Sequence, residues 1–176
     1  MRQFDKTQLL ATFDTIFSQQ LNAETRPAVT FATIEKPPRA IYPILYLPVE
    51  VKTRELEGKA VLAREALEHG LNVVIGSAWP MVSWHDKLPP GIFFFKTMNM
   101  GDAQNMLLWA RHGHLIAVLD EEMFGVRADP DYISATVHPR APALADLVCA
   151  QGAAYARAFP FPVPLKITGN PRTKTY

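Results

Sequence analysis

Residues 44–77 read ILYLPVEVKTRELEGKAVLAREALEHGLNVVIGS, and this stretch decides the fold class. It begins with the apolar run Ile44–Leu47 and ends with the apolar run Val73–Ile75, each short enough to be a strand. Between the two runs lies a segment with helical periodicity. Gly70 marks the end of that segment, because glycine readily adopts the left-handed conformation that follows a helix. The stretch therefore predicts a strand–helix–strand unit.

The predicted helix covers residues 54–69. Apolar side chains recur along it at helical spacing and are expected to form its buried face: Leu56, Ala60, Ala63 and Leu67. Glu55 with Lys59, and Arg64 with Glu68, are pairs of opposite charge four residues apart. Such pairs are expected on the exposed side of a helix.

The same pattern continues along the chain. Four further apolar runs follow: Ile92–Phe95, Leu115–Leu119, Leu147–Cys149 and Leu165–Ile167. Most of the runs are apolar throughout, which is typical of strands buried on both faces. A second helical pattern covers residues 102–112, with Asn99 as its expected N-cap and Gly113 as its end. This alternation predicts an α/β fold, a Rossmann-like parallel sheet of about six strands with helices on both faces.

The chain divides into three predicted parts. Residues 1–38 form an N-terminal helix and linker, residues 39–172 form the Rossmann-like domain, and residues 173–176 form a tail. Within the first part, Gln8–Leu21 has the spacing of an amphipathic helix. This helix packs either on the sheet or on a second copy of the chain as a homodimer, or else lies on a membrane surface.

The composition excludes several classes of protein. Of the 176 residues, 48% are hydrophobic and 20% are charged, which is ordinary for one folded domain. Basic and acidic residues balance to a net charge of +1 without any basic block, so nucleic acid is not an expected partner. No signal peptide, transmembrane segment, metal-ligand motif or cofactor loop is apparent. We therefore expect a cytoplasmic protein, free or peripheral at the inner membrane, with no cofactor and no metal site.

Polar residues follow the apolar runs, and the carboxyl ends of parallel strands meet at one edge of a sheet, where ligands bind. Glu50 follows the first run. It either accepts a proton from a substrate hydroxyl or pairs with Lys52 or Arg54 at the start of the helix. Lys96 follows the third run, where its ammonium group can meet a phosphate or a carboxylate such as Glu121.

The later runs also end in polar residues. Three acids follow the fourth run: Asp120, Glu121 and Glu122. Either they contact a ligand, or solvent and a helix N-terminus stabilise their negative charges. Gly169 and Asn170 follow the last run as a turn signal that also offers a backbone amide to an anionic ligand. Trp79 and Trp84 are expected in the core or in a lid, although an aromatic face also suits a sugar ring.

These positions carry a resemblance to a known family. Six stretches match it in order and spacing: Tyr46–Leu56 (YLPVEVKTREL), Val74–Ser77 (VIGS), Leu88–Ile92 (LPPGI), Leu119–Glu122 (LDEE), Ala145–Val148 (ADLV) and Ile167–Arg172 (ITGNPR). Through them, residues 41–172 resemble bacterial surface-carbohydrate biosynthesis proteins, glycosyltransferases of the two-domain GT-B type. The resemblance covers only the N-terminal, Rossmann-like domain of that family.

The resemblance implies a function. The N-terminal domain of a GT-B enzyme usually holds the acceptor and often the catalytic base, whereas the C-terminal domain binds the nucleotide sugar. We therefore expect the acceptor-side half of a glycosyltransferase of surface polysaccharide biosynthesis, incomplete without a donor-binding domain or chain. Glu50 or Glu121 would be the base. The candidate substrate-binding residues are Lys52, Arg54, Glu55, Lys96, Asp120, Glu122 and Asn170. The alternative is a non-catalytic sugar-binding or scaffold module that self-associates.

Overall fold

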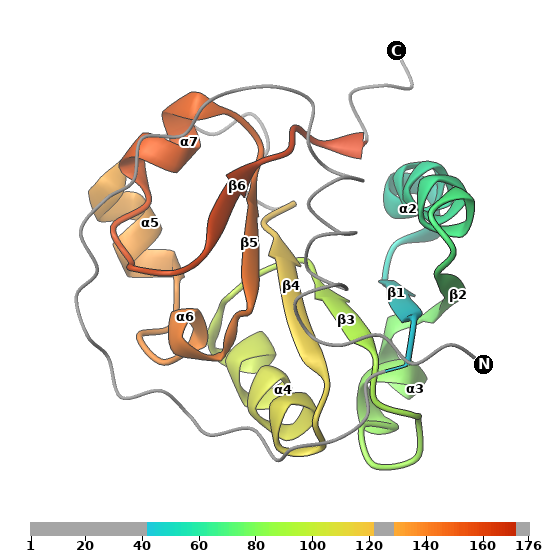
Figure 1. Cartoon of the computed structure of the whole chain (residues 1–176). Helices are drawn as coiled ribbons and strands as arrows, with labels where there is room; N and C mark the ends of the chain where they lie inside the picture. The colour runs from blue at the N-terminus through green and yellow to red at the C-terminus, as the bar shows by residue number, and fades with distance from the viewer. Residues whose placement is uncertain (1–41, 122–128, 172–176) are drawn as a thin grey trace.

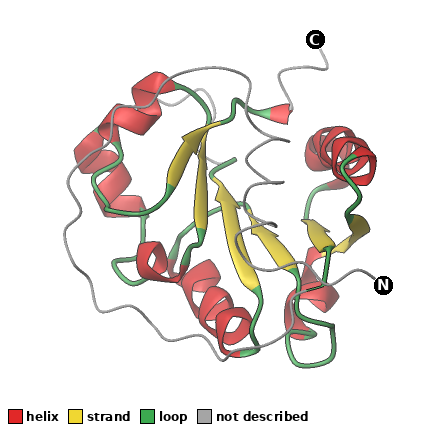
Figure 2. Cartoon of the chain, in the orientation of Figure 1, coloured by secondary structure: helices red, strands yellow, loops and turns green. Residues whose placement is uncertain are grey.

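The computed structural model describes residues 42–121 and 129–171, which form a six-stranded sheet with helices on both faces (Figures 1 and 2). The strands are β1 (Ile44–Val49), β2 (Asn72–Ser77), β3 (Ile92–Phe95), β4 (Leu115–Leu119), β5 (Leu147–Ala150) and β6 (Leu165–Ile167). The helices are α2 (Lys52–Glu68), α3 (Ala78–Ser83), α4 (Met100–Arg111), α5 (Pro130–Thr136), α6 (Ala141–Leu144) and α7 (Ala153–Ala158). The predicted Rossmann-like fold is confirmed. The predicted helix Gln8–Leu21 lies outside the described residues.

All neighbouring strands pair in parallel, in the order β2-β1-β3-β4-β5-β6. The chain moves outward in one direction from β1 to β2 and then returns to the other side of β1 with β3. The order of the strands therefore reverses between β1 and β3. In open parallel sheets, ligands bind beyond the carboxyl ends of the strands at this point of reversal.

Alternation along the strands divides the apolar core into two clusters, one on each face of the sheet. Leu47 and Phe94 belong to the cluster that α2 covers with Leu62 and Ala66. Tyr46, Phe93 and their neighbours belong to the other cluster, which receives apolar side chains from the five other described helices. Strands β3, β4 and β5 are buried throughout, as predicted for strands with two covered faces.

Strand β2 differs from that prediction. It lies at the edge of the sheet, and its Val74 and Ile75 side chains are substantially exposed. A strand at the edge has a neighbour on one side only, so its apolar run does not by itself imply burial on both faces.

The predicted buried face of α2 is largely wrong, although Ala63 is buried as predicted. Leu67 is exposed and Leu56 only partly buried, whereas the buried side chains include Glu55, Lys59, Leu62 and Ala66. This buried stripe lies about one residue away from the predicted one, which rotates the helix by about 100°. The expected surface pair of Glu55 and Lys59 therefore points into the protein. The expected exposed pair of Arg64 and Glu68 is present at 3.6 Å.

The predicted ends of the helices are confirmed. The Asn99 side chain accepts a hydrogen bond from the backbone N–H of Asp102, which makes Asn99 the N-cap of α4. Gly70 after α2 and Gly113 after α4 both have positive φ angles, of 82° and 83°. An L-residue with a side chain rarely adopts this conformation, which is why glycine stands at both helix ends.

Gly91 precedes β3 and lies against β1, which gives a test of the packing between these strands. A Cβ atom on Gly91 would lie 2.6 Å from the backbone oxygen of Ile44. Gly91→Ala should therefore lower the free energy of unfolding by about 1–3 kcal/mol, measured by urea denaturation. Gly101→Ala is the matched control, since its Cβ would have only an ordinary contact at 3.5 Å. Equal stability of the two variants would contradict this close approach.

Candidate functional site

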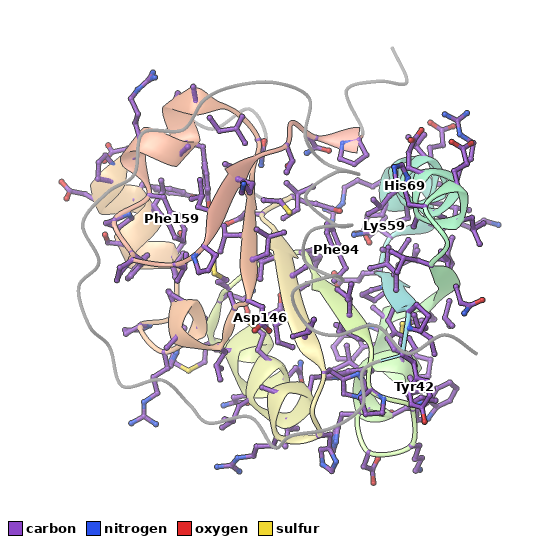
Figure 3. The ribbon with its side chains drawn as sticks, viewed as in Figure 1. Tyr42, Lys59, His69, Phe94, Asp146 and Phe159 are labelled. Atoms are coloured by element: carbon purple, nitrogen blue, oxygen red, sulfur yellow. The ribbon has the colours of Figure 1, made fainter. Side chains whose placement is uncertain are left out.

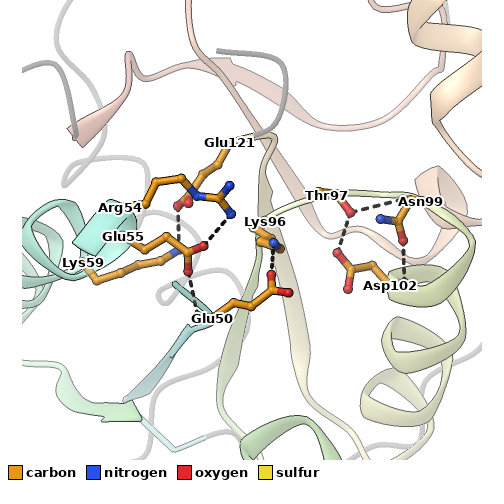
Figure 4. Close-up of polar contacts among 9 residues, drawn as sticks. All are labelled: Glu50, Arg54, Glu55, Lys59, Lys96, Thr97, Asn99, Asp102 and Glu121. Atoms are coloured by element: carbon orange, nitrogen blue, oxygen red, sulfur yellow. Dashed lines mark hydrogen bonds and ion pairs between the residues drawn. The ribbon is translucent and has the colours of Figure 1, made fainter. Parts of the chain in front are cut away.

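The candidate site lies at the carboxyl edge of the sheet and is built from the residues that follow β1, β3 and β4 (Figure 4). Glu50 and Lys96 follow β1 and β3, the two neighbouring strands at which the strand order reverses. The Lys96 ammonium group donates to the Glu50 carboxylate in an ion pair. The side chains of Glu50 and Lys96 are 36% and 23% exposed, so this pair is accessible to a ligand.

The predicted alternative for Glu50 placed it in a pair with Lys52 or Arg54. The observed partner instead comes from the adjacent strand, 46 positions along the chain. Arg54 pairs with Glu55, at 2.9 Å, and Lys52 is exposed at the start of α2. The proximity of Glu50 to Lys96 results from the pairing of β1 with β3.

Glu55 supports the start of α2 from within the protein. Its Oε2 accepts a hydrogen bond from the backbone N–H of Glu50 at 2.8 Å, and its Oε1 accepts one from Arg54 at 2.9 Å. Burial raises the pKa of the Glu55 carboxyl, but the hydrogen bonds from Glu50 and Arg54 and the charges of Lys96 and Lys59 outweigh it, leaving a net lowered pKa. Glu55 therefore fixes the backbone of Glu50.

A second ion pair is buried beside the first. The Lys59 ammonium group lies 2.7 Å from Glu121 Oε1, with side chains only 3% and 7% exposed. Lys59 also lies over the ring of Phe94, 4.6 Å from its centroid. Both side chains are labelled in Figure 3. The backbone N–H of Glu121 donates to the Lys96 carbonyl at 2.9 Å, which connects the two pairs. Glu121 therefore meets Lys59 rather than the Lys96 ammonium group.

The start of α4 forms the other side of the site. The Thr97 hydroxyl donates to Asp102 at 2.6 Å, and the backbone N–H of Asp102 donates to Asn99. Burial raises the pKa of the Asp102 carboxyl, and the Thr97 hydrogen bond and the charge of Lys96 oppose that rise only in part. These contacts fix the chain that carries Lys96.

The remaining candidates lie farther along the same edge. Asp120 and Asn170 are buried, and Gln151 donates a hydrogen bond to the backbone carbonyl of Asp120. The Tyr155 hydroxyl is buried on the same side, and burial together with the charge of Asp120 raises its pKa. Glu122 lies outside the described residues. Asn170 follows β6, three strands beyond β3. Contacts join five of the described candidates: Glu50, Arg54, Glu55, Lys96 and Glu121.

Sequence reasoning missed Lys59 as a site residue. The signal was the helical spacing of Glu55, Lys59, Leu62 and Ala66, which places two charged and two apolar side chains on one face.

The sequence analysis also predicted Trp79 and Trp84 in the core or in a lid. Both are exposed at the surface, by 79% and 45%, which excludes core packing in the described structure.

The charges of the ion-paired residues balance, without Asp102 and Asp120 at the same edge. Three carboxylates, Glu50, Glu55 and Glu121, meet three cations, Arg54, Lys59 and Lys96. One oxygen, Glu121 Oε2, is buried without a hydrogen-bond partner among the described residues. A balanced cluster that offers carboxylate oxygens suits a neutral ligand with hydroxyl donors better than a free anion. Within residues 42–121 and 129–171, no group of His, Cys, Asp and Glu side chains could hold a metal ion.

The chain matches no protein-family model, and no curated protein or solved structure is significantly similar to it. In the described part of the chain, no helix is both long enough and apolar enough to cross a membrane. The functional argument therefore depends on the geometry of the site and on the motifs of the sequence.

The buried pair of Lys59 and Glu121 predicts a large effect on stability. Lys59→Met should leave the Glu121 carboxylate buried without its partner and lower the free energy of unfolding by about 3–5 kcal/mol. Adding Glu121→Gln should restore part of that loss, because the unpaired charge is then removed. Urea denaturation of both single variants and the double variant measures this coupling.

Arg64→Met is the control for Lys59→Met, since Arg64 forms exposed ion pairs on the same helix. It should leave the free energy of unfolding close to that of the wild type, because solvent weakens exposed ion pairs. If Lys59→Met were equally mild, the buried pair would not stabilise the fold as argued.

The lowered pKa of Glu55 predicts a dependence of stability on pH. A carboxyl whose pKa is lower in the folded protein than in the unfolded chain stabilises the fold above the unfolded value, about 4.3. That stabilisation disappears as the pH falls through the folded-state pKa. Glu55→Gln should therefore lower stability at pH 7 and make the loss of stability below about pH 5 shallower. Denaturation curves from pH 7 to pH 3 test this, with exposed Glu57→Gln as a control that should follow the wild type.

Proposed function

We propose that this chain is the acceptor-side half of a glycosyltransferase of bacterial surface polysaccharide biosynthesis, with Glu50 as its base. The carrying observation is the accessible pair of Glu50 and Lys96 at the point where the strand order reverses. Ligands of open parallel sheets bind at this point. The resemblance of residues 41–172 to the surface-carbohydrate family also implies an acceptor site at this edge of the sheet.

The proposed chemistry follows from the positions of the two side chains. Glu50 takes the proton of the acceptor hydroxyl, whose oxygen forms a bond to the anomeric carbon of a nucleotide sugar. The bond from that carbon to the phosphate oxygen breaks, and the phosphate leaves with the electron pair. The Lys96 ammonium group turns from Glu50 to this phosphate as the bond breaks. The ammonium group thereby stabilises the negative charge that develops on the phosphate as its bond to the sugar breaks.

The environment of Glu121 suits a different role. Its carboxylate is buried and paired with Lys59, and its backbone N–H bonds to Lys96. We therefore assign Glu121 to positioning Lys96, and the base to Glu50 alone. The donor-binding half is proposed to come from another domain or another chain, in keeping with the GT-B resemblance.

A second function, a sugar-binding module without catalysis, is favoured by one observation. Each of the two Glu carboxylates considered as the base, Glu50 and Glu121, already has a lysine partner in this structure. Such paired groups can bind hydroxyls without transferring a proton. Replacement of the Glu50 carboxylate by an amide distinguishes the two functions, because an amide still accepts a hydrogen bond but is no base.

The test uses the bacterium that encodes this chain. Deletion of its gene should reduce the surface polysaccharide, measured by monosaccharide analysis of washed cells, and wild-type protein should restore it. Glu50→Gln should fail to restore it, since loss of a general base slows a reaction by about 10²–10⁴-fold. Exposed Glu57→Gln, at equal protein level, should restore it fully.

Two outcomes would contradict the proposal in different ways. Unchanged surface polysaccharide in the deletion strain would exclude a function in its biosynthesis. Full restoration by Glu50→Gln would exclude Glu50 as the base and favour the sugar-binding module.

A further inference from the structure

Trp79, the second residue of α3, is the most exposed large apolar side chain of the described residues, with 79% of its surface accessible. Tryptophan is highly buried on average in folded proteins, because its rings have a large apolar surface. Trp109 of the same chain follows that rule and is fully buried. The exposure of Trp79 therefore leaves the flat apolar surface of its rings available to a ligand.

The sheet places Trp79 beside the candidate site. Val49 of β1 pairs with Ser77 of β2, so the chain leaves both strands side by side, towards Glu50 and towards α3. Met81 of α3 packs into the apolar cluster of Tyr46. Trp79 precedes Met81 by two residues, about 200° around the helix, and so points away from that cluster. Trp79 thus presents its rings at the surface next to the end of β1.

The opposite side of the site is also apolar at its surface. Met100, the first residue of α4, is 64% exposed. Asp102 in the same turn is close enough to interact with the charges of Lys96 and Glu50. The starts of α3 and α4 therefore flank the accessible ion pair, each with one exposed apolar side chain.

An accessible carboxylate beside an exposed tryptophan matches the chemistry of a sugar ring. A pyranose has hydroxyl groups around its edge and apolar C–H groups on its faces. A carboxylate accepts hydrogen bonds from the hydroxyls, and the flat apolar surface of tryptophan packs against the C–H face. A phosphate has no apolar face that could pack against the Trp79 rings, and an acidic peptide offers no ring of hydroxyl groups to the Glu50 carboxylate.

We infer that Trp79 is the stacking surface for the acceptor sugar ring whose hydroxyl faces Glu50. This inference rests on the proposed function and extends it, because it adds a substrate-binding residue and states that the acceptor is a ring sugar bound by its face. Trp79 contacts the substrate and orients it, while Glu50 handles the proton.

The test measures binding to the full chain. The probes are the mono- and oligosaccharides released by mild acid hydrolysis from the surface polysaccharide of the encoding bacterium. Trp79→Ala should weaken binding about tenfold or more in calorimetric titration. Trp84→Ala is the matched control: Trp84 is also exposed and lies at the other end of α3, so its removal should change the affinity less than twofold. Both variants should keep the melting temperature of the wild type, because neither side chain is buried.

Fluorescence gives a second measurement. The chain contains three tryptophans, and in a Trp84→Phe protein Trp79 is the one that remains exposed. Saccharide binding should protect its emission from quenching by acrylamide. Sorbitol, which has hydroxyl groups but no ring face, should give no protection. Equal protection by sorbitol would overturn the stacking assignment.

The remaining outcomes are equally decisive. Unchanged affinity of Trp79→Ala, or no binding of any fraction by the wild type, would overturn the inference. A wild-type dimer that Trp79→Ala converts to a monomer, seen by light scattering, would assign Trp79 to a contact between copies instead. The deletion strain and Glu50→Gln test the proposed function separately. A negative result for Trp79 alone would therefore not contradict the proposed function.

Discussion

The buried ion pair between Lys59 and Glu121 determines where α2 lies on the sheet. Lys59 extends from the helix across Phe94 of β3 to reach a carboxylate that follows β4. Neither charge could be buried alone, because the loss of hydration would not be compensated. The helix must therefore keep the rotation that brings Lys59 inward, and this rotation also places Glu55 beneath the backbone of Glu50. The geometry of the accessible site therefore depends on an ion pair that is itself buried.

The fold could be predicted from the sequence because its signals are local. Each apolar run became a strand, and Gly70, Asn99 and Gly113 marked helix ends through conformations that depend on a few neighbouring residues. The rotation of α2 could not be predicted in this way. Apolar spacing favoured Leu56 and Leu67, but partners from distant strands made it favourable to bury Glu55 and Lys59 instead. Burial of a charge depends on which other charges the topology brings near, and spacing within one helix does not contain that information.

The site shows the same division between local and non-local information. Its place was predicted by a general rule of parallel sheets, and Glu50, Glu55, Lys96 and Glu121 do meet there. Their pairing was not predicted, since sequence neighbours such as Lys52 were weighed as partners of Glu50. At a strand end, however, the nearest side chain often belongs to the adjacent strand, about 4.8 Å away. The order of the strands therefore decides the partners.

The two carboxylates of this site differ in what they can do, and their environments explain the difference. Glu121 is enclosed and paired, so its protonation would leave Lys59 as an unpaired buried cation. Glu50 is accessible, and its partner Lys96 is also partly exposed. Proton transfer requires a group that can be charged and neutral in turn within one cycle. Of the two carboxylates, only the accessible Glu50 suits the base proposed for this site, whereas the burial of Glu121 keeps the chain that carries Lys96 in place.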